Sequence, residues 1–305
     1  MLLFQAFPRK KTLVDFGRSS KLIISFAAHP HTSLSLPATE ALSLNPILFS
    51  QVPALDSVLA KQISLIDEHS WPDAGQSKDQ VKSILTEVLT TYLKSRFTPA
   101  GTTNPNLNLV SSRPPILTAW SQATMTTATV LPVESLFPIA DLWRLALLDP
   151  SVGLWVTSLQ LPSDITDPLN IFLSKATLAL DSPSKGARNF SYIVLRLLCN
   201  SLSNPPLAKK LLLLGEMRNK VTSTLIASLL HPDATVRTAS ASLAFNIAAV
   251  LQKERVDAMK SGRNTQVGSE TDLGDWEIEV ITAVVEALDR EKENEEVGMF
   301  FHYFT

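Results

Sequence analysis

Helical periodicity dominates the chain after residue 131. Stretches rich in Leu and Ala, each of roughly 10–18 residues, are separated by short breaks such as Asp149-Pro150 and His231-Pro232. No alternating run of β-branched residues supports a sheet. The pattern predicts an all-α fold of helices joined by short turns.

One amphipathic helix is predicted upstream, within residues 66–98. Ser77 and Gln80 have the spacing of a capping box, in which the two side chains satisfy backbone donors at a helix start. The apolar residues that follow recur at the i, i+3, i+4, i+7 spacing of one helix face. They are Val81, Ile84, Leu85, Val88, Leu89, Tyr92 and Leu93.

Two segments have the composition of linkers. Residues 31–65 are rich in Pro, Ser and Thr, with prolines spaced too closely for a helix to persist. Residues 99–130 combine Pro and Gly with many Thr, Ser and Asn. Residues 1–30 have an excess of basic residues typical of a mitochondrial transit peptide, but a disordered start is the preferred interpretation.

Internal similarity indicates how the helices are arranged. Residues 191–202 (SYIVLRLLCNSL) align with residues 237–248 (RTASASLAFNIA), so that Asn200 matches Asn246. Their separation, 246 − 200 = 46, lies within the ~40–47-residue period of HEAT and armadillo repeats. We therefore expect residues 131–305 to form an armadillo- or HEAT-like α-solenoid, whose concave face can hold an extended peptide.

Composition narrows the class of function. A net charge of −2 is unlike that of a protein that neutralises nucleic-acid phosphates. The single cysteine, Cys199, excludes an internal disulfide framework and fits a reducing compartment, so a cytoplasmic or nuclear location is expected. The apolar runs fall short of the roughly 18–20 residues of a bilayer span. We predict neither a nucleic-acid nor a membrane partner.

Catalytic chemistry is not predicted. The five histidines lie in predicted linkers or turns, and Cys199 lies in an apolar helix where a buried structural thiol is expected. Nucleotide-binding, serine-hydrolase and metalloprotease motifs are absent from the sequence. The chain is expected to be a non-enzyme without a cofactor or a metal.

Polar residues within the leucine-rich helices are the candidate peptide-binding residues. The amides of Asn200 and Asn246 can bond to both N–H and C=O of an extended peptide, although a hydrogen bond between core helices is the alternative. Arg144 could bind a carboxylate or simply pair with Asp141. Residues 181–240 contain eight basic and three acidic residues, a net +5 that favours an acidic ligand. The candidates are Arg144, Arg188, Arg196, Asn200, Arg237 and Asn246.

Four segments together resemble the PUL domain, the armadillo-like module that ends the phospholipase-activating protein family. They are residues 131–152 (LPVESLFPIADLWRLALLDPSV), 189–202 (NFSYIVLRLLCNSL), 231–250 (HPDATVRTASASLAFNIAAV) and 276–297 (WEIEVITAVVEALDREKENEEV). Residues 28–61 are similar to the segment that joins a thioredoxin domain to the PUL domain in fungal proteins that begin with a PPPDE peptidase. The resemblance implies that both upstream domains and the last helices of the PUL domain are absent from this chain.

The resemblance also implies a partner. Known PUL domains bind the acidic C-terminal tail of the hexameric AAA ATPase that extracts ubiquitinated proteins. We therefore expect an adaptor of ubiquitin-dependent protein handling that captures such a tail. The alternative is a structural spacer or scaffold segment of a larger thioredoxin- or isopeptidase-type protein, with no ligand of its own.

Overall fold

The computed structural model describes residues 44–72, 75–97, 114–159, 167–213, 215–261 and 270–291. All of these residues belong to one compact unit, residues 43–305. The disorder expected for residues 1–30, the loop part of the second linker and the expected incomplete C-terminus lie outside the described residues.

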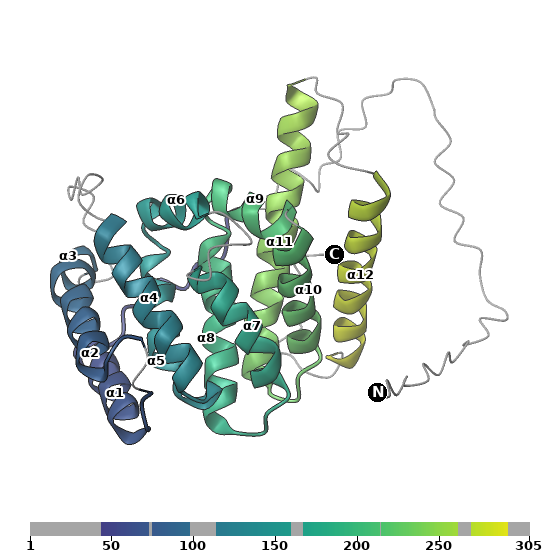
Figure 1. Ribbon diagram of the computed structural model, residues 1–305. Coiled ribbons are helices and arrows are strands. Elements are labelled where there is room, and N and C mark those ends of the chain that lie inside the picture. The colour runs from purple at the N-terminus through teal and green to yellow at the C-terminus, as the bar shows by residue number, and fades with distance from the viewer. Residues whose placement is uncertain are drawn as a thin grey trace, which may run out of the picture. The chain divides into compact units, whose positions relative to one another are not determined.

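The described residues are helical and contain no strand, which confirms the all-α prediction (Figure 1). The elements in chain order are α1 (Leu55–Glu68), α2 (Lys78–Glu87), the π-helix η1 (Val88–Leu93), α3 (Lys94–Arg96), α4 (Pro114–Val130), the 3-10 helix η2 (Val133–Ser135), α5 (Phe137–Ala146), α6 (Pro150–Ser158), α7 (Pro168–Leu180), α8 (Lys185–Ser201), α9 (Pro205–Leu213), α10 (Gly215–Leu229), α11 (Ala234–Lys260) and α12 (Glu270–Arg290).

Helix α8 is the centre of the stack. It packs against α5, α11 and α7. Ser184 starts α8 by accepting a hydrogen bond from Ala187 N at 3.0 Å, and Asp233 starts α11 by accepting from Val236 N at 3.2 Å. Helices α5, α8 and α11 are therefore successive members of one stack.

The predicted amphipathic segment contains the expected capping box. Ser77 Oγ accepts from Gln80 N, and Gln80 Oε1 accepts from Ser77 N at 2.9 Å. Helix continues without interruption through α2, η1 and α3, and six of its seven predicted face residues are buried, with Ile84 half-buried. Local periodicity was a sufficient guide here because the apolar face lies against the core.

The linker prediction for residues 31–65 is wrong from Leu55 onward, where α1 begins. Helix α1 begins two residues after Pro53, and its residues Leu55, Leu59 and Ile66 are buried. Gln62 is also completely buried, and its side-chain oxygen accepts a hydrogen bond from Ile139 N at 3.2 Å. The closely spaced prolines concealed a helix that starts immediately after the last of them.

The linker prediction for residues 99–130 is also wrong, because residues 114–130 form α4. The indole rings of Trp120 and Trp143 stack with their centroids 3.9 Å apart, and Trp143 Nε1 donates to Thr124 Oγ1 at 2.9 Å. The buried hydroxyls of Thr124 and Thr127 donate to the carbonyls of Trp120 and Ala123 at 2.9 and 2.7 Å, so both have partners within α4. Tertiary packing overrides the low helix propensity of a Thr-rich sequence.

The predicted domain boundary at residue 131 is therefore not observed. Helices α1 and α4 pack on α5 and α7, so the core is continuous across that position. Within the described part of the chain, α11 alone has the length and composition of a membrane span, but much of it is buried in the helix stack as a core helix.

Candidate peptide-binding face

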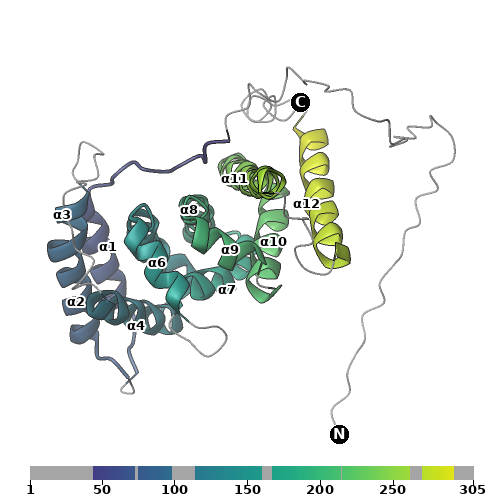
Figure 2. The same cartoon turned by 90° about the horizontal axis from the view of Figure 1, so that it is seen from above.

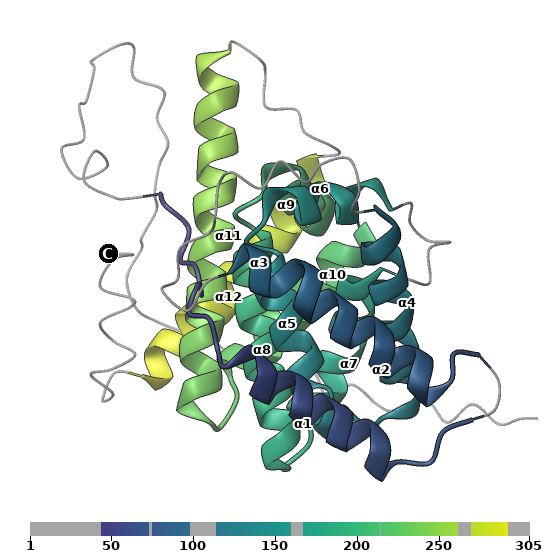
Figure 3. The same cartoon turned by 90° about the vertical axis from the view of Figure 1, so that its left-hand side faces the viewer.

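Residues 44–54, which precede α1, form an extended segment without secondary structure. Pro46 and Pro53 prevent a helix here, since proline lacks the N–H and fixes its φ angle. The segment, drawn in purple, runs past α8 toward α11 (Figures 2 and 3). Its chain direction is opposite to the order of the helices that it crosses.

Two buried asparagines hold the main chain of this segment. Asn200 Oδ1 accepts from Phe49 N at 2.8 Å, and its Nδ2 donates to Phe49 O at 3.1 Å. Asn246 Oδ1 accepts from Ile47 N at 2.7 Å, and its Nδ2 donates to Ile47 O at 2.9 Å. One asparagine per helix repeat therefore binds every second residue of the extended chain.

The same amides also join neighbouring helices. Asn200 Nδ2 donates to the carbonyl of Arg144 at 2.9 Å, and Asn246 Nδ2 donates to the carbonyl of Cys199 at 3.3 Å. Each amide therefore joins neighbouring helices, as the alternative interpretation proposed, and also binds an extended main chain, while binding of a partner peptide stays a prediction. The bound main chain is a segment of the same polypeptide.

Arg144 adds further main-chain contacts, which extend along the segment to Gln51. Its guanidinium pairs with Asp141, as the alternative interpretation proposed, and it also donates to the carbonyls of Phe49 and Gln51. A guanidinium can do this because its five donors point in several fixed directions. Arg144 is buried, and these three contacts all lie within the molecule.

Arg196 lies under the aromatic ring of Phe49. Its guanidinium carbon is 4.4 Å from the Phe49 ring centroid and 4.8 Å from that of Tyr192, which is cation–π geometry. Burial lowers the pKa of Arg196 from its usual value, although an arginine remains charged. Its Nε is buried and has no hydrogen-bond partner within the described part of the chain. We refer to the surface made by Arg144, Arg196, Asn200 and Asn246 as the peptide face.

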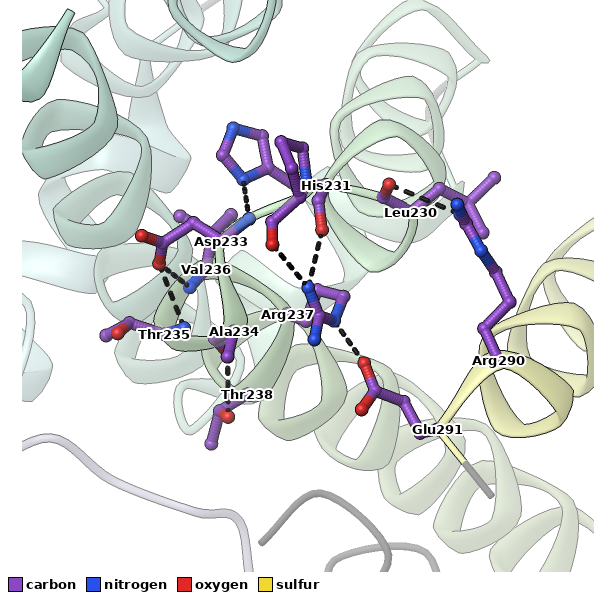
Figure 4. Close-up of polar contacts among 11 residues, drawn as sticks. Leu230, His231, Asp233, Ala234, Thr235, Val236, Arg237, Thr238, Arg290 and Glu291 are labelled. Atoms are coloured by element: carbon purple, nitrogen blue, oxygen red, sulfur yellow. Dashed lines mark hydrogen bonds and ion pairs between the residues drawn. The ribbon is translucent and has the colours of Figure 1, made fainter. Parts of the chain in front are cut away.

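Arg188 and Arg237 are not part of the peptide face. They lie near the starts of α8 and α11, and Arg188 is twelve residues before Asn200, or about 18 Å along a helix. Arg188 pairs with Asp233 at 3.1 Å. Arg237 pairs with Glu291 at the end of α12 (Figure 4).

Arg237 also closes the turn between α10 and α11. It donates to the carbonyls of His231 and Pro232 at 2.9 and 2.7 Å, which satisfies acceptors beyond the end of α10 (Figure 4). The positions of Arg188 and Arg237 therefore favour structural roles for both.

Much of the positive charge in residues 181–240 is paired internally. Besides Arg188 and Arg237, Lys210 pairs with the buried Asp167 at 2.9 Å, and Lys220 pairs with Glu216 at 2.9 Å. Lys210 and Arg237 pair with Asp167 and Glu291, which lie outside residues 181–240, so the net charge of the segment overstates the positive charge that its surface presents. Asp167 and Glu291 are distant in sequence from the residues they pair with, whereas Glu216 is one helical turn from Lys220.

A cavity of about 660 Å³ adjoins the peptide face. The start of the extended segment forms one wall, and residues of α9 and α11 form the others. Its lining includes Leu44, Pro46, Ala208, Lys209, Val250 and Lys253. The cavity combines an apolar floor with exposed lysines, but Glu254 and Asp257 also line it, so its charge is mixed.

The thiol of Cys199 is unsuited to nucleophilic catalysis. Cys199 is completely buried, and burial raises the pKa of its thiol far above the usual range, so it lacks thiolate character. Among the described residues, no group of three or more His, Cys, Asp or Glu side chains could hold a metal ion.

Sequence reasoning missed the occupant of the peptide face. The sequence analysis expected no helix in residues 44–52, where the structure has none, but it assigned them to a linker and not to a bound segment. The available signal was the placement of Ile47, Phe49 and Gln51 at alternate positions between two prolines, which puts them on one side of an extended chain.

Comparison with known families gives one match. The model of the PUL domain family matches residues 43–299, which covers most of the chain and includes the extended segment. A search of curated proteins found no match.

Proposed function

The chain belongs to the PUL domain family of protein-interaction modules, and from this we propose that it is an adaptor that captures an acidic peptide tail. The ligand that we propose is the C-terminal tail of the AAA ATPase of ubiquitin-dependent protein handling. The adaptor acts in the cytoplasm or nucleus and performs no chemical step.

The observation that carries this proposal is the pair of asparagines on the peptide face. Asn200 and Asn246 each bind N–H and C=O of one extended residue. Such contacts recognise main chain and not side chains. The same amide groups are therefore also suited to the main chain of a partner peptide. This arrangement of donors and acceptors supports a site for an extended peptide.

The basic side chains around the face support an acidic ligand, although Glu254 and Asp257 also line the adjoining cavity. Arg196 contributes a half-buried guanidinium, and the exposed Lys209 and Lys253 line the adjoining cavity. Lys209 Nζ lies 3.8 Å from Glu254 Oε1, which is a long distance for an ion pair. An incoming carboxylate could replace such a weak pairing. Lysines at a rim act mainly on the association rate and on specificity.

A structural role is the second candidate function. The specific observation in its favour is that the extended segment already fills the peptide face. In that case the asparagines only fix the segment to the helix stack, and the chain is a spacer or scaffold without its own ligand.

Fluorescence anisotropy with a labelled acidic peptide distinguishes the two. An adaptor gives saturable binding that weakens as salt is raised, because charge contributes to it. Lys253→Glu should weaken binding by roughly threefold to tenfold, whereas Lys61→Glu, the same charge change at an exposed position on α1, should not. Absence of saturable binding, or equal weakening by both variants, would favour the spacer.

A further inference from the structure

We propose that residues 297–305 of this chain, VGMFFHYFT, pack on the outward side of α12 and cover it. That side carries a row of three apolar residues, Ile278, Ile281 and Val285, which we refer to as the α12 stripe. None of the three belongs to the peptide face or lines its cavity. The inference therefore goes beyond the proposed function and does not depend on it.

The inward side of α12 fixes the orientation of the helix. Trp276 and Ala287 are buried, and α12 packs on α10 and α11 (Figure 1). Trp276 Nε1 donates to Thr222 Oγ1 of α10 near one end of the helix, and Glu291 pairs with Arg237 of α11 at the other. Because α12 is held near both ends, the exposure of the α12 stripe is a property of the fold.

The α12 stripe has the spacing of a packed helix face, yet it is exposed. Ile278, Ile281 and Val285 are 63%, 60% and 58% exposed, and their i, i+3, i+7 spacing places them in one row. Helix α12 is the last described helix and lies at the edge of the stack (Figure 2). A terminal repeat of a solenoid needs a polar outer face to stay soluble. The α12 stripe therefore calls for a cover.

Charge favours residues 297–305 over a second copy of α12 as this cover. A second copy packed on the α12 stripe would bring two sets of acidic side chains together, and such like-charge contacts oppose association. Residues 297–305 contain six apolar residues and no acidic residue, so they bury apolar surface without this repulsion. The exposed acidic residues of α12 are Asp275, Glu279, Glu286 and Asp289.

The chain between α12 and the apolar run is long enough to turn back. Ile281 lies nine residues before the end of α12 at Arg290, or about 14 Å along the helix. Residues 291–296, EKENEE, are all polar, and six extended residues span at most about 20 Å. The direct connection also gives residues 297–305 a high effective concentration at the α12 stripe.

Thiol labelling of the full-length protein measures whether the α12 stripe is covered. Cys199 is completely buried and burial raises the pKa of its thiol, so the native cysteine does not react. Ile281→Cys therefore supplies one reactive thiol on the stripe. Leu178→Cys is the matched control, because Leu178 is 62% exposed on α7, outside the stripe. The reagent is a neutral maleimide, which the acidic residues of α12 do not repel.

The thiol of Ile281→Cys should react at least about tenfold more slowly than that of Leu178→Cys, because the cover must open before the reagent can enter. Adding Phe300→Ser, Phe301→Ser and Phe304→Ser to Ile281→Cys should restore the rate of the control, since the segment then loses most of the apolar surface that holds it. The same three substitutions should leave the rate of Leu178→Cys unchanged. If the triple substitution abolishes the helical circular dichroism, Phe301→Ser alone replaces it and should raise the rate at least about threefold.

Three results would overturn the inference. Equal rates for Ile281→Cys and Leu178→Cys in the otherwise native chain would show that nothing covers the α12 stripe. A slow rate that rises when the protein is diluted would identify a second copy as the cover. A slow rate that the phenylalanine substitutions leave unchanged would assign the cover to another part of the chain.

Discussion

Asn200→Ala is the substitution that tests most directly how the helix stack holds its extended segment. Asn200 is completely buried and makes three hydrogen bonds, two with Phe49 and one with the carbonyl of Arg144. Alanine keeps the helix propensity of α8 and removes only the amide. The change therefore isolates the contribution of these polar contacts.

The expected loss follows from the partners that are left behind. Phe49 N–H and the carbonyl of Arg144 lose this partner, whereas the carbonyl of Phe49 keeps Arg144 as a donor. A buried polar group without a partner costs about 1–3 kcal/mol. Because Phe49 is only half-buried, water can reach part of the site. We expect the free energy of unfolding to fall by about 2–4 kcal/mol in total.

Urea unfolding followed by far-UV circular dichroism measures this loss, provided that the m-value is unchanged. The matched control is Asn219→Ala on α10, where the side chain is exposed and the expected change is within about 0.5 kcal/mol. Asn246→Ala should behave like Asn200→Ala, because it binds Ile47 in the same way. If Asn200→Ala is as mild as Asn219→Ala, the asparagines do not stabilise the assembly as we reason.

Three further predictions concern stability. Gly153→Ala should destabilise by about 1–3 kcal/mol, because the new Cβ would lie 2.6 Å from Asn204 Nδ2, whereas Gly215→Ala, with open space around its Cβ, should stabilise by about 0.4–1 kcal/mol; thermal unfolding of both variants checks the sign. Arg144→Lys should destabilise by about 1–3 kcal/mol in urea unfolding, since one ammonium cannot replace all the guanidinium contacts, and a change below that of an exposed substitution would contradict this. Burial lowers the pKa of His231, so the imidazole binds a proton more tightly in the unfolded chain, and the free energy of unfolding falls as pH drops through about 6.5. His231→Gln should therefore lose less stability on acidification than the wild type. Identical pH profiles of stability for the two proteins would refute this role of His231.

The local pattern alone identified the helices whose apolar face is continuous in sequence. Ser77 and Gln80 cap the predicted helix, and the leucine- and alanine-rich stretches after residue 131 are helical. The local pattern failed at α1 and α4, where prolines or threonines lower the local helix propensity. These two helices are stabilised by packing, α1 against α5 and α4 against α7. Propensity is a short-range quantity, but the free energy that stabilises these two helices comes from packing.

The repeat alignment also identified the two residues that matter most on the peptide face. Asn200 and Asn246 are 46 positions apart, and each accepts a hydrogen bond from a main-chain N–H of the extended segment, one from α8 and the other from α11. That relation is visible in sequence because each repeat places its asparagine at the same point of an equivalent helix.

Only the tertiary structure decided what these side chains bind. The residues held by Asn200 and Asn246 are 151 and 199 positions away, and the partner of Arg237 comes from the end of α12. A charged or amide side chain in a sequence specifies which groups it can satisfy, but not which of them the fold will place within 3 Å. The order in which helices stack, set by burial of their apolar faces, makes that choice.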